Sequence, residues 1–240
     1  MSDYRNKLNQ SIGHPLPTWE PCAAPMRAPM SGRYCRLEPL NPERHAQQLY
    51  QAHQQSRDED WTYLPYGPYQ TYEAYLAWQQ SVYTGNDPLF FAVIDQVSDM
   101  AVGILSYLRI TPAVGVIEVG HIHFSPLLQN KPAATEAIFL TMKHIFDELG
   151  YRRFEWKCDA FNAPSRKAAL RFGFSYEGIF RQATMYKGHS RDTAWFAIID
   201  KEWPALKQAY ETWLSPDNFD TQGRQKSSLS VLSAIALDRD

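Results

Sequence analysis

The sequence predicts a mixed α/β (α+β) fold in which helices flank a central, mostly antiparallel sheet. Segments rich in β-branched and aromatic residues alternate with amphipathic segments along most of the 240 residues. Near the middle, residues 117–150 have the pattern of a strand, a short polar loop and a helix. With 44% hydrophobic residues, a chain of this length can bury one substantial core.

The chain is expected to divide into an arm, a domain and a tail. Residues 1–30 carry prolines at intervals too short for a helix, which predicts an extended arm. Trp19 and Met26 are expected to hold this arm against the domain or a partner subunit. The domain is expected at residues 31–215, and the polar residues 216–240 are expected to form the tail.

Local signals predict the elements before the central unit. Residues 34–40 alternate like a strand, and Asn41 and Pro42 then cap and open a helix that should end before Arg57. A second helix is expected at residues 71–84. A turn then leads into an antiparallel meander with strands at residues 89–94, 101–110 and 114–124.

The central helix has a clear start and end. Pro126 stops the preceding strand because proline has no ladder donor, and Pro132 suits the first position of a helix. Apolar residues recur every three or four positions up to Gly150, a natural C-terminal cap. The first amides of such a helix have no partner inside it and lie at the positive end of the helix dipole, so this loop can hold a phosphate.

Beyond the central helix, residues 153–158 alternate again and should run parallel to the strand before that helix, through a right-handed crossover. Asn162 opens a further helix that should end at residue 173. Three strands and a last helix are then expected, at residues 174–177, 183–187, 193–200 and 202–214. A short apolar run at residues 229–237 has no assigned role.

The composition argues against several classes of function. With 24 basic and 26 acidic residues, the formal net charge is -2 and no block of like charge occurs, so a nucleic-acid or membrane-surface role has no electrostatic support. No apolar run approaches the roughly 20 residues that would span a bilayer, and no signal-peptide pattern opens the chain. Three cysteines, at positions 22, 35 and 158, form no spaced pair. This favours a reducing compartment and predicts a cytoplasmic protein.

The window from Gln129 to Ala134 resembles the pyrophosphate-binding signature of the GCN5-related N-acetyltransferases (GNAT), which runs Q or R, two residues, G, one residue, G or A. Pro132 stands where the family usually has its first glycine, and it removes one possible phosphate donor. Strings in the same order over residues 31–204 resemble the RimJ/RimL-like branch. They include Arg36-Leu37-Glu38-Pro39-Leu40, Glu118-Val119-Gly120-His121, Asn162 with Ser165-Arg166, and Lys187-Gly188.

This resemblance implies the GNAT fold, with a splayed parallel pair of strands around an acyl-CoA site. It implies acetyl-CoA, or another short acyl-CoA such as succinyl-CoA, as co-substrate, and no metal. The acceptor would be an amine of a small molecule or a peptide, with no nucleic-acid or membrane partner, and a homodimer is allowed. The implied cofactor-binding residues are His123, Phe124, Gln129, Asn130, Lys131, Ala133, Ala134, Thr135, Asn162, Ser165 and Arg166.

Acyl transfer to an amine needs a group that accepts the amine's proton, since alkylamines are mostly protonated near neutral pH. Glu118, His121 and His123 are the candidates. In a regular strand the two histidines share one face and Glu118 lies on the other, but a bulge at Gly120 would bring all three together. Alternatively, the histidines are satisfied interior groups and Glu118 only pairs with an arginine, Arg36 or Arg109. The His-x-His pair lacks the further ligands of a zinc site.

The departing thiolate needs a proton donor. Asn162 and Ser165 lie three residues apart at a helix start and can meet the same ligand. In the family this asparagine binds the pantetheine arm, and a serine or tyrosine nearby protonates the thiolate. The helix here has no tyrosine, so the acid role falls to Ser165 or to water. Alternatively, Asn162 is only an N-cap and Ser165 a helix-start hydroxyl.

Residues 56–70 combine charges and aromatic rings in a loop broken by prolines and a glycine, and such loops often carry function. Trp61, Tyr63 and Tyr66 are therefore candidates for binding the acceptor, although they could equally cap the core. Two rival readings of the whole chain remain at this point. One is a CoA-binding regulatory or structural domain without turnover, and the other is an interaction module built on this loop.

Overall fold

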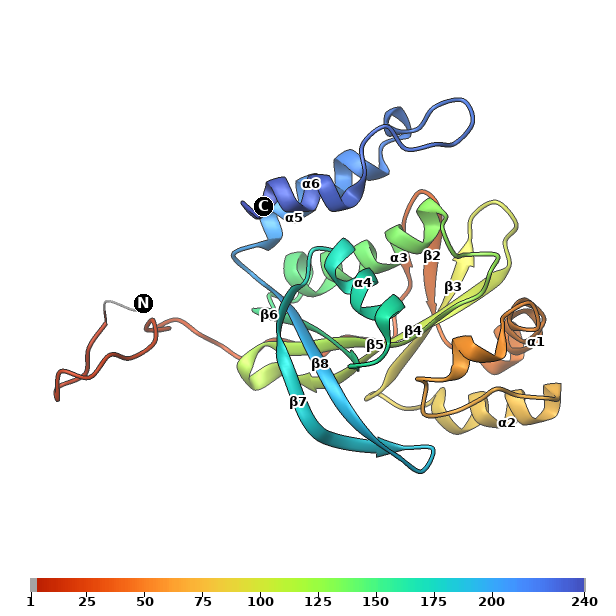
Figure 1. The fold of residues 1–240 in the computed structure, drawn as a ribbon, viewed down its shortest axis with the longest axis horizontal. Helices are drawn as coiled ribbons and strands as arrows, with labels where there is room; N and C mark the ends of the chain where they lie inside the picture. Colours follow the sequence, from red (N-terminus) through yellow and green to blue (C-terminus); the bar gives the residue numbers. More distant parts are fainter. Residues whose placement is uncertain (1–3, 240) are drawn as a thin grey trace.

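The computed structural model describes residues 4–239 and contains one eight-stranded sheet with the order β1-β2-β3-β4-β5-β6-β8-β7 (Figure 1). Neighbouring strands are antiparallel except for the parallel pair of β5 and β6, so the predicted mixed, mostly antiparallel fold is confirmed. The strands are β1 Met30–Ser31, β2 Cys35–Pro39, β3 Leu89–Asp95, β4 Ala101–Thr111, β5 Val116–Phe124, β6 Arg153–Asp159, β7 Ser175–Tyr186 and β8 His189–Ile199.

Six α-helices accompany the sheet within residues 4–239. They are α1 Pro42–His53, α2 Tyr72–Val82, α3 Pro132–Lys143, α4 Ala163–Arg171, α5 Trp203–Leu214 and α6 Leu229–Ala236. Side chains cap the starts of α1 and α2, where Asn41 accepts from the amide of Glu43 and Thr71 from that of Ala74. None of the helices in this part of the chain is both long and apolar enough to cross a membrane.

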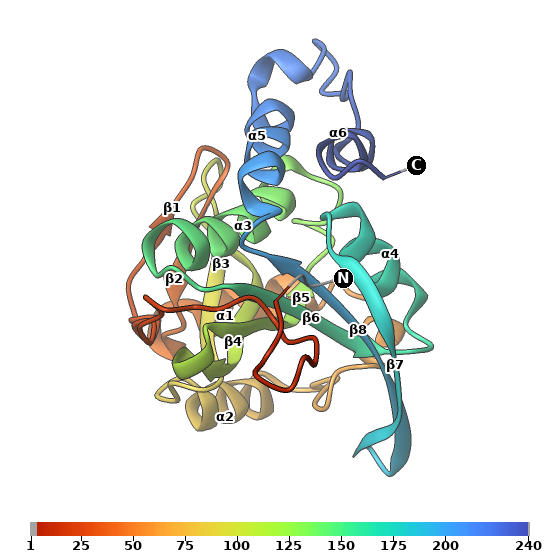
Figure 2. The same ribbon diagram turned by 90° about the vertical axis from the view of Figure 1, so that its left-hand side faces the viewer.

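The helices cover both faces of the sheet, and each face has its own core. Alternate residues of β3 supply the two cores, because successive side chains of a strand point to opposite faces. Phe91 and Val93 pack with α3 and α5, whereas Phe90 and Ala92 pack with α1 and α2. Figure 2 shows α1 and α2 on one side of the sheet and α3 on the other. The result is a three-layer sandwich over β2 to β5.

The parallel pair separates halfway along its length. Pairing of β5 with β6 begins at Val116 with Arg153 and ends at Val119 with Trp156, although β5 continues to Phe124. Beyond that point β6 pairs only with β8. The edge of β5 that faces β6 is therefore open toward the carboxyl ends of both strands, which is the splay that the family resemblance implies.

A bulge in β5 lies next to this opening. Gly120 pairs with Ser106 and His123 with Ile104, so β5 has two residues, His121 and Ile122, opposite a single residue of β4. The bulge follows Gly120 instead of falling on it, and His121 adopts a left-handed φ of 51°. Because the alternation is reset there, Glu118, His121 and His123 all lie on the α1 and α2 side of the sheet.

One of the predicted boundaries is wrong. Residues 174–177 and 183–187 belong to one long strand, β7, whose pairing with β8 is irregular between Phe180 and Thr184. The strand continues because Phe180 stacks on Trp195 at 4.3 Å and the Asp192 carboxylate accepts from the amide of Gln182. The predicted end of the central helical run at Gly150 is confirmed, because a π-helical turn, His144–Glu148, continues regular α3 beyond Lys143 and Gly150 then adopts a left-handed φ of 70°.

The arm meets the domain at one of the two predicted anchors. The Trp19 indole donates to the carbonyl of Ala113 at 3.0 Å, and the Arg152 guanidinium lies over its ring. Met26 is 75% exposed, so it does not hold the arm against the domain. In the tail, the apolar run without an assigned role forms α6, which packs against α5 and buries Leu229 completely.

Candidate active site

The opening between β5 and β6 is flanked by the N-termini of two helices, because α3 follows β5 and α4 follows β6. Helix N-termini present unpaired amides and positive partial charge. Glu136 fixes α3 against the sheet, since its carboxylate accepts from the amides of Arg33, Tyr34 and Cys35. The Thr135 hydroxyl accepts from the Arg171 guanidinium, which ties α3 to α4. The start of α3 is thus held against the sheet and against the last residue of α4.

The predicted phosphate loop offers fewer amides than the sequence indicates. The amide of Lys131 donates to the carbonyl of Leu128 at 3.3 Å, and that of Ala134 donates to Lys131 at 3.1 Å. The amides of Asn130 and Ala133 have no acceptor among residues 4–239. The Gln129 side chain donates to the carbonyl of Phe124 at 2.7 Å and so closes the loop onto the end of β5. Pro132 occupies the first turn of α3, as expected.

At the start of α4, both predicted ligand residues have a structural contact. The Asn162 side chain caps the helix by accepting from the amide of Ser165 at 3.1 Å. The Ser165 hydroxyl accepts from the Trp156 indole at 3.0 Å and also hydrogen-bonds the side chain of Cys158. Arg166 donates to the carbonyl of Ala160 at 3.1 Å and lies over the Tyr176 ring. Trp156 is the last residue of β6 that pairs with β5. Ser165, which contacts it, therefore lies where these two strands begin to separate.

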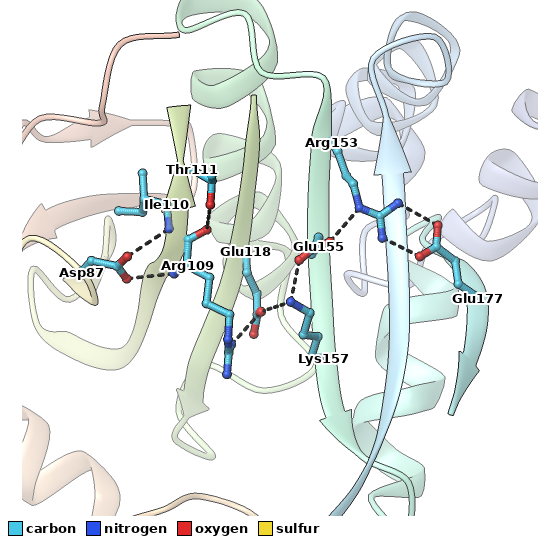
Figure 3. A network of polar contacts seen from close by, with 9 residues as sticks. All are labelled: Asp87, Arg109, Ile110, Thr111, Glu118, Arg153, Glu155, Lys157 and Glu177. Carbon is cyan, nitrogen blue, oxygen red and sulfur yellow. Dashed lines mark hydrogen bonds and ion pairs between the residues drawn. The ribbon is translucent and has the colours of Figure 1, made fainter. Parts of the chain in front are cut away.

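Glu118 lies in β5, two residues before Gly120, and its side chain is 4% exposed. Its Oε2 atom accepts from Arg109 at 2.7 Å and from Lys157 at 3.0 Å (Figure 3). Burial raises the pKa of this carboxyl, while the charges of Lys157 and Arg109 oppose the shift. The Oε1 atom has no partner among residues 4–239 and lies on the side of Gly120. One carboxylate oxygen is thus fixed, and the other is free beside the bulge.

The two cations that hold Glu118 belong to a chain of charges across the strands (Figure 3). Lys157 also pairs with Glu155 at 2.6 Å, and Arg153 joins Glu155 to Glu177. The Lys157 ammonium lies 3.8 Å above the Trp195 ring. Arg109 is one of the two alternative partners that the sequence indicates for Glu118, whereas Lys157 was missed. Lys157 follows the apolar Trp156 in β6, so its side chain must point to the opposite face of the sheet, the face of Glu118. This alternation is the sequence signal that indicates the contact.

His121 lies at the bulge, where the ring of Tyr66 covers it. Its Nδ1 atom is 3.2 Å from the Tyr66 hydroxyl, and the two rings stack at 5.6 Å. Burial lowers the pKa of His121 to about 4, so the ring is neutral near pH 7. A neutral imidazole has one donor and one acceptor nitrogen, and the Tyr66 hydroxyl can satisfy either form of Nδ1.

His123 is enclosed in the aromatic core and is 3% exposed. It stacks on His53 at 4.0 Å and meets the edge of Trp61 at 3.9 Å. Burial lowers its pKa to about 4, and neither ring nitrogen has a partner in the described part of the chain. These contacts favour the interior-group reading of this histidine over a role at the opening.

The aromatic loop, residues 56–70, contributes both to the core and to the surroundings of His121. Trp61 is 5% exposed and belongs to the core formed with α1 and α2, which agrees with the capping alternative. Tyr66 faces His121, and the Tyr63 hydroxyl donates to the carbonyl of Phe161 at the start of α4. Lys187 donates to the Trp61 carbonyl at 2.8 Å. The loop therefore contacts β5, the turn before α4 and the turn after β7.

No group of three or more potential metal ligands occurs within residues 4–239. The site consists of a split parallel pair, the starts of α3 and α4, and a buried carboxylate. Residues 35–175, more than half of the chain, match the acetyltransferase (GNAT) domain family. The chain belongs to this family, and the family prediction is confirmed.

Known relatives agree with the assignment. A GCN5-related N-acetyltransferase from Brucella melitensis superposes with a TM-score of 0.88 and is 49% identical, over 91% of this chain and 99% of that one. The uncharacterized N-acetyltransferase YnaD of Bacillus subtilis is 30% identical over 86 residues, which is 36% of this chain and 50% of YnaD. The ribosomal-protein-serine acetyltransferase of Escherichia coli is 30% identical over 105 residues, 43% of this chain and 58% of that protein. The matches therefore span little more than half of these two curated relatives.

Proposed function

We propose that the protein is an acyl-CoA-dependent N-acyltransferase that moves an acetyl group from acetyl-CoA to a primary amine by direct attack. The observation that carries the proposal is the end of β5 and β6 pairing at Val119 and Trp156, between the N-termini of α3 and α4. Acetyl-CoA would supply the activated acetyl group. Another short acyl-CoA such as succinyl-CoA could serve as the donor instead. Measuring CoA release with each donor in turn distinguishes the two.

The residues at the opening fit an acyl-CoA. The unpaired edge of β5 beyond Val119 offers backbone groups to an extended arm, as a neighbouring strand would. The free amides of Asn130 and Ala133, at the positive end of α3, suit a pyrophosphate. Asn162 and Ser165 lie across the opening at the start of α4, where the pantetheine and the sulfur would be bound.

Glu118 is proposed as the group that accepts the amine's proton, directly or through water. Its Oε2 atom is held by Arg109 and Lys157, which leaves Oε1 free to accept. Once neutral, the amine nitrogen can form a bond to the thioester carbonyl carbon, and the carbon–sulfur bond then breaks. The Ser165 hydroxyl is proposed to donate a proton to the departing thiolate. His121 is the second candidate base, and His123 is the third because it is enclosed.

The acceptor class is a primary amine of a peptide or a small molecule. The name of the Escherichia coli relative specifies a ribosomal-protein serine, which supports a protein amine as one candidate acceptor. Tyr63 and Tyr66, which join the aromatic loop to α4 and to His121, are proposed to contact it.

The proposal is tested by the release of free CoA from acetyl-CoA in the presence of a panel of peptide and small-molecule amines. Steady release with at least one amine supports N-acyl transfer. One observation favours a non-catalytic CoA-binding domain. Glu118 pairs with two cations, which lower the proton affinity of its carboxylate and so make it a weaker base. Tight binding of acetyl-CoA without release for any amine would support that alternative.

A further inference from the structure

A cavity of about 850 Å³ opens on the face of the sheet that carries Glu118. It is lined by residues of β4, β6, β7 and β8, among them the aromatic rings of Phe180 and Trp195. Four cationic side chains line it, namely Arg109, Lys157, Arg181 and Arg191, and its lining includes no aspartate or glutamate. This is notable in a chain whose formal net charge is -2. The cavity therefore has the opposite sign to the protein as a whole.

Two of the four charges are already compensated. Arg109 pairs with Glu118, and Lys157 pairs with Glu118 and Glu155. Arg181 and Arg191 have no carboxylate within ion-pair distance in the described part of the chain. The Nε atom of Arg191 is buried without an acceptor, and so is the indole nitrogen of Trp195. Since buried donors normally have partners, these groups lack an acceptor that a bound molecule can supply.

The chemistry of these groups defines what they bind. A guanidinium presents a planar fork of N–H donors that matches the oxygens of a carboxylate or a phosphate. Arg109 and Lys157 connect the same cavity to Glu118, the proposed base. A molecule with an anionic group at one end and an amine at the other would thus place each end near a group that favours it. The surplus positive charge also favours the neutral form of the amine, which is the form that attacks.

We infer that the acceptor is an amine that also carries a carboxylate or phosphate group, bound in this cavity by Arg181 and Arg191. The inference rests on the proposed N-acyltransferase function and names its acceptor class. The two arginines set specificity and are not proposed to take part in bond making.

Matched pairs of amines test the inference. O-phosphoethanolamine is compared with ethanolamine, β-alanine with its amide, and a peptide with an N-terminal Ser-Asp-Glu sequence with one that starts Ser-Asn-Gln. The kcat/KM of the preferred anionic acceptor, measured by CoA release, is expected to exceed that of its neutral partner by about 10- to 100-fold, the effect of a charged hydrogen-bonded pair. The pair with the largest ratio separates phosphate, small carboxylate and peptide acceptors. Ratios near one in all three pairs would overturn the inference.

Variants locate the effect. In Arg181→Gln/Arg191→Gln the ratio of the preferred pair is expected to fall below about threefold, while Arg181→Lys/Arg191→Lys should keep only part of it because the charge remains but the planar fork of donors is lost. Arg224→Gln is the matched control, since Arg224 is exposed and pairs with Asp220 outside the cavity. A ratio that survives in the double glutamine variant would refute the role of these arginines.

Binding without turnover separates this inference from the proposed function. Calorimetry with each amine alone should detect the anionic members and not their neutral partners, and the double glutamine variant should lose the signal. If anionic amines bind in this way but no CoA is released, the transfer function fails and the anion site stands. If CoA is released but no anionic amine binds more tightly than its neutral partner, the transfer function stands and this inference fails.

Discussion

The Lys157 ammonium lies 3.0 Å from Oε2 of Glu118, and Lys157 directly follows Trp156, the last residue of β6 that pairs with β5. Because Arg109 binds the same oxygen, both cations hold one side of the carboxylate and leave Oε1 free. The pairing fixes the direction of the free oxygen, and the two cations oppose the rise in the pKa of Glu118 that burial causes.

Glu118→Gln is expected to lower kcat/KM by roughly 10- to 10⁴-fold, the range of general base catalysis, with acetyl-CoA affinity unchanged. Glu155→Gln is the matched control because Glu155 is equally buried and also pairs with Lys157, but both of its oxygens have partners. Its kcat/KM should fall less than tenfold. Steady-state kinetics and calorimetry check both variants. Full activity of Glu118→Gln would transfer the role to His121 or to water.

Lys157→Met removes one of the two cations that oppose the effect of burial on Glu118. The pKa of the carboxyl should rise further, so the ascending limb of the pH profile of kcat/KM should move to higher pH. The variant is also expected to lose about 3 kcal/mol of stability, because Glu118 and Glu155 lose a buried partner. Lys157→Arg keeps the charge and should move the limb much less. An unmoved limb in Lys157→Met would mean that Glu118 is not the titrating base.

The sequence predicts the central unit well because its signals are local. Pro126, Pro132 and the apolar period of α3 act within a few residues of where they stand. The contact between Glu118 and Lys157 joins positions 39 residues apart and depends on the register of the parallel pair, which no local pattern specifies. The cavity is harder still to predict, since it depends on residues of four strands. The helix α6 was missed because its short apolar run could be placed only by knowing that α5 offers a surface.

Pro132 occupies the first turn of α3, where its missing N–H removes one candidate phosphate donor. Both Pro132→Gly and Pro132→Ala are expected to bind acetyl-CoA as well as the parent or more tightly, since each restores that donor. The alanine variant controls for chain flexibility, because glycine costs about 1 kcal/mol in a helix relative to alanine. Calorimetry gives the affinities. A severe loss in both variants would show that the fixed φ of proline matters more than the hydrogen bond.

His123 should make the fold sensitive to acid. Burial lowers its pKa to about 4 from an ordinary value near 6.5, so the folded state binds fewer protons than the unfolded state between these pH values. The free energy of unfolding should therefore decrease as the pH falls from about 6.5 toward 4. The protonation of His123 alone should lower it by about 2 kcal/mol at pH 5. His123→Phe keeps the aromatic packing and removes the titration. Its stability at pH 5, relative to pH 7.5, should fall less than that of the parent in urea denaturation. An identical fall in both proteins would exclude His123 as a source of the acid sensitivity.

Ser165 is the one side chain at the start of α4 that combines a hydroxyl with a position beside the opening of the strands. Its oxygen accepts from the Trp156 indole, and its hydroxyl also hydrogen-bonds the Cys158 side chain, so donation to a thiolate would replace that second contact. A thiol has a pKa near 8.5, so a thiolate is a tolerable leaving group and the acid should matter less than the base. Ser165→Ala is therefore expected to lower kcat by about 10- to 100-fold with little change in the KM for acetyl-CoA. It should also cost about 1 kcal/mol of stability, because the indole loses its acceptor.

Asn162→Ala provides the contrast within the same helix turn. It removes the N-cap and the proposed pantetheine ligand, so it should raise the KM for acetyl-CoA more than it lowers kcat, at a stability cost of about 1 kcal/mol. Ser165→Thr restores a hydroxyl and should recover part of the lost kcat. The two alanine variants thus lose similar stability and differ in which kinetic parameter changes. If Ser165→Ala loses stability but turns over at the parental rate, the hydroxyl serves only the Trp156 indole and water protonates the thiolate.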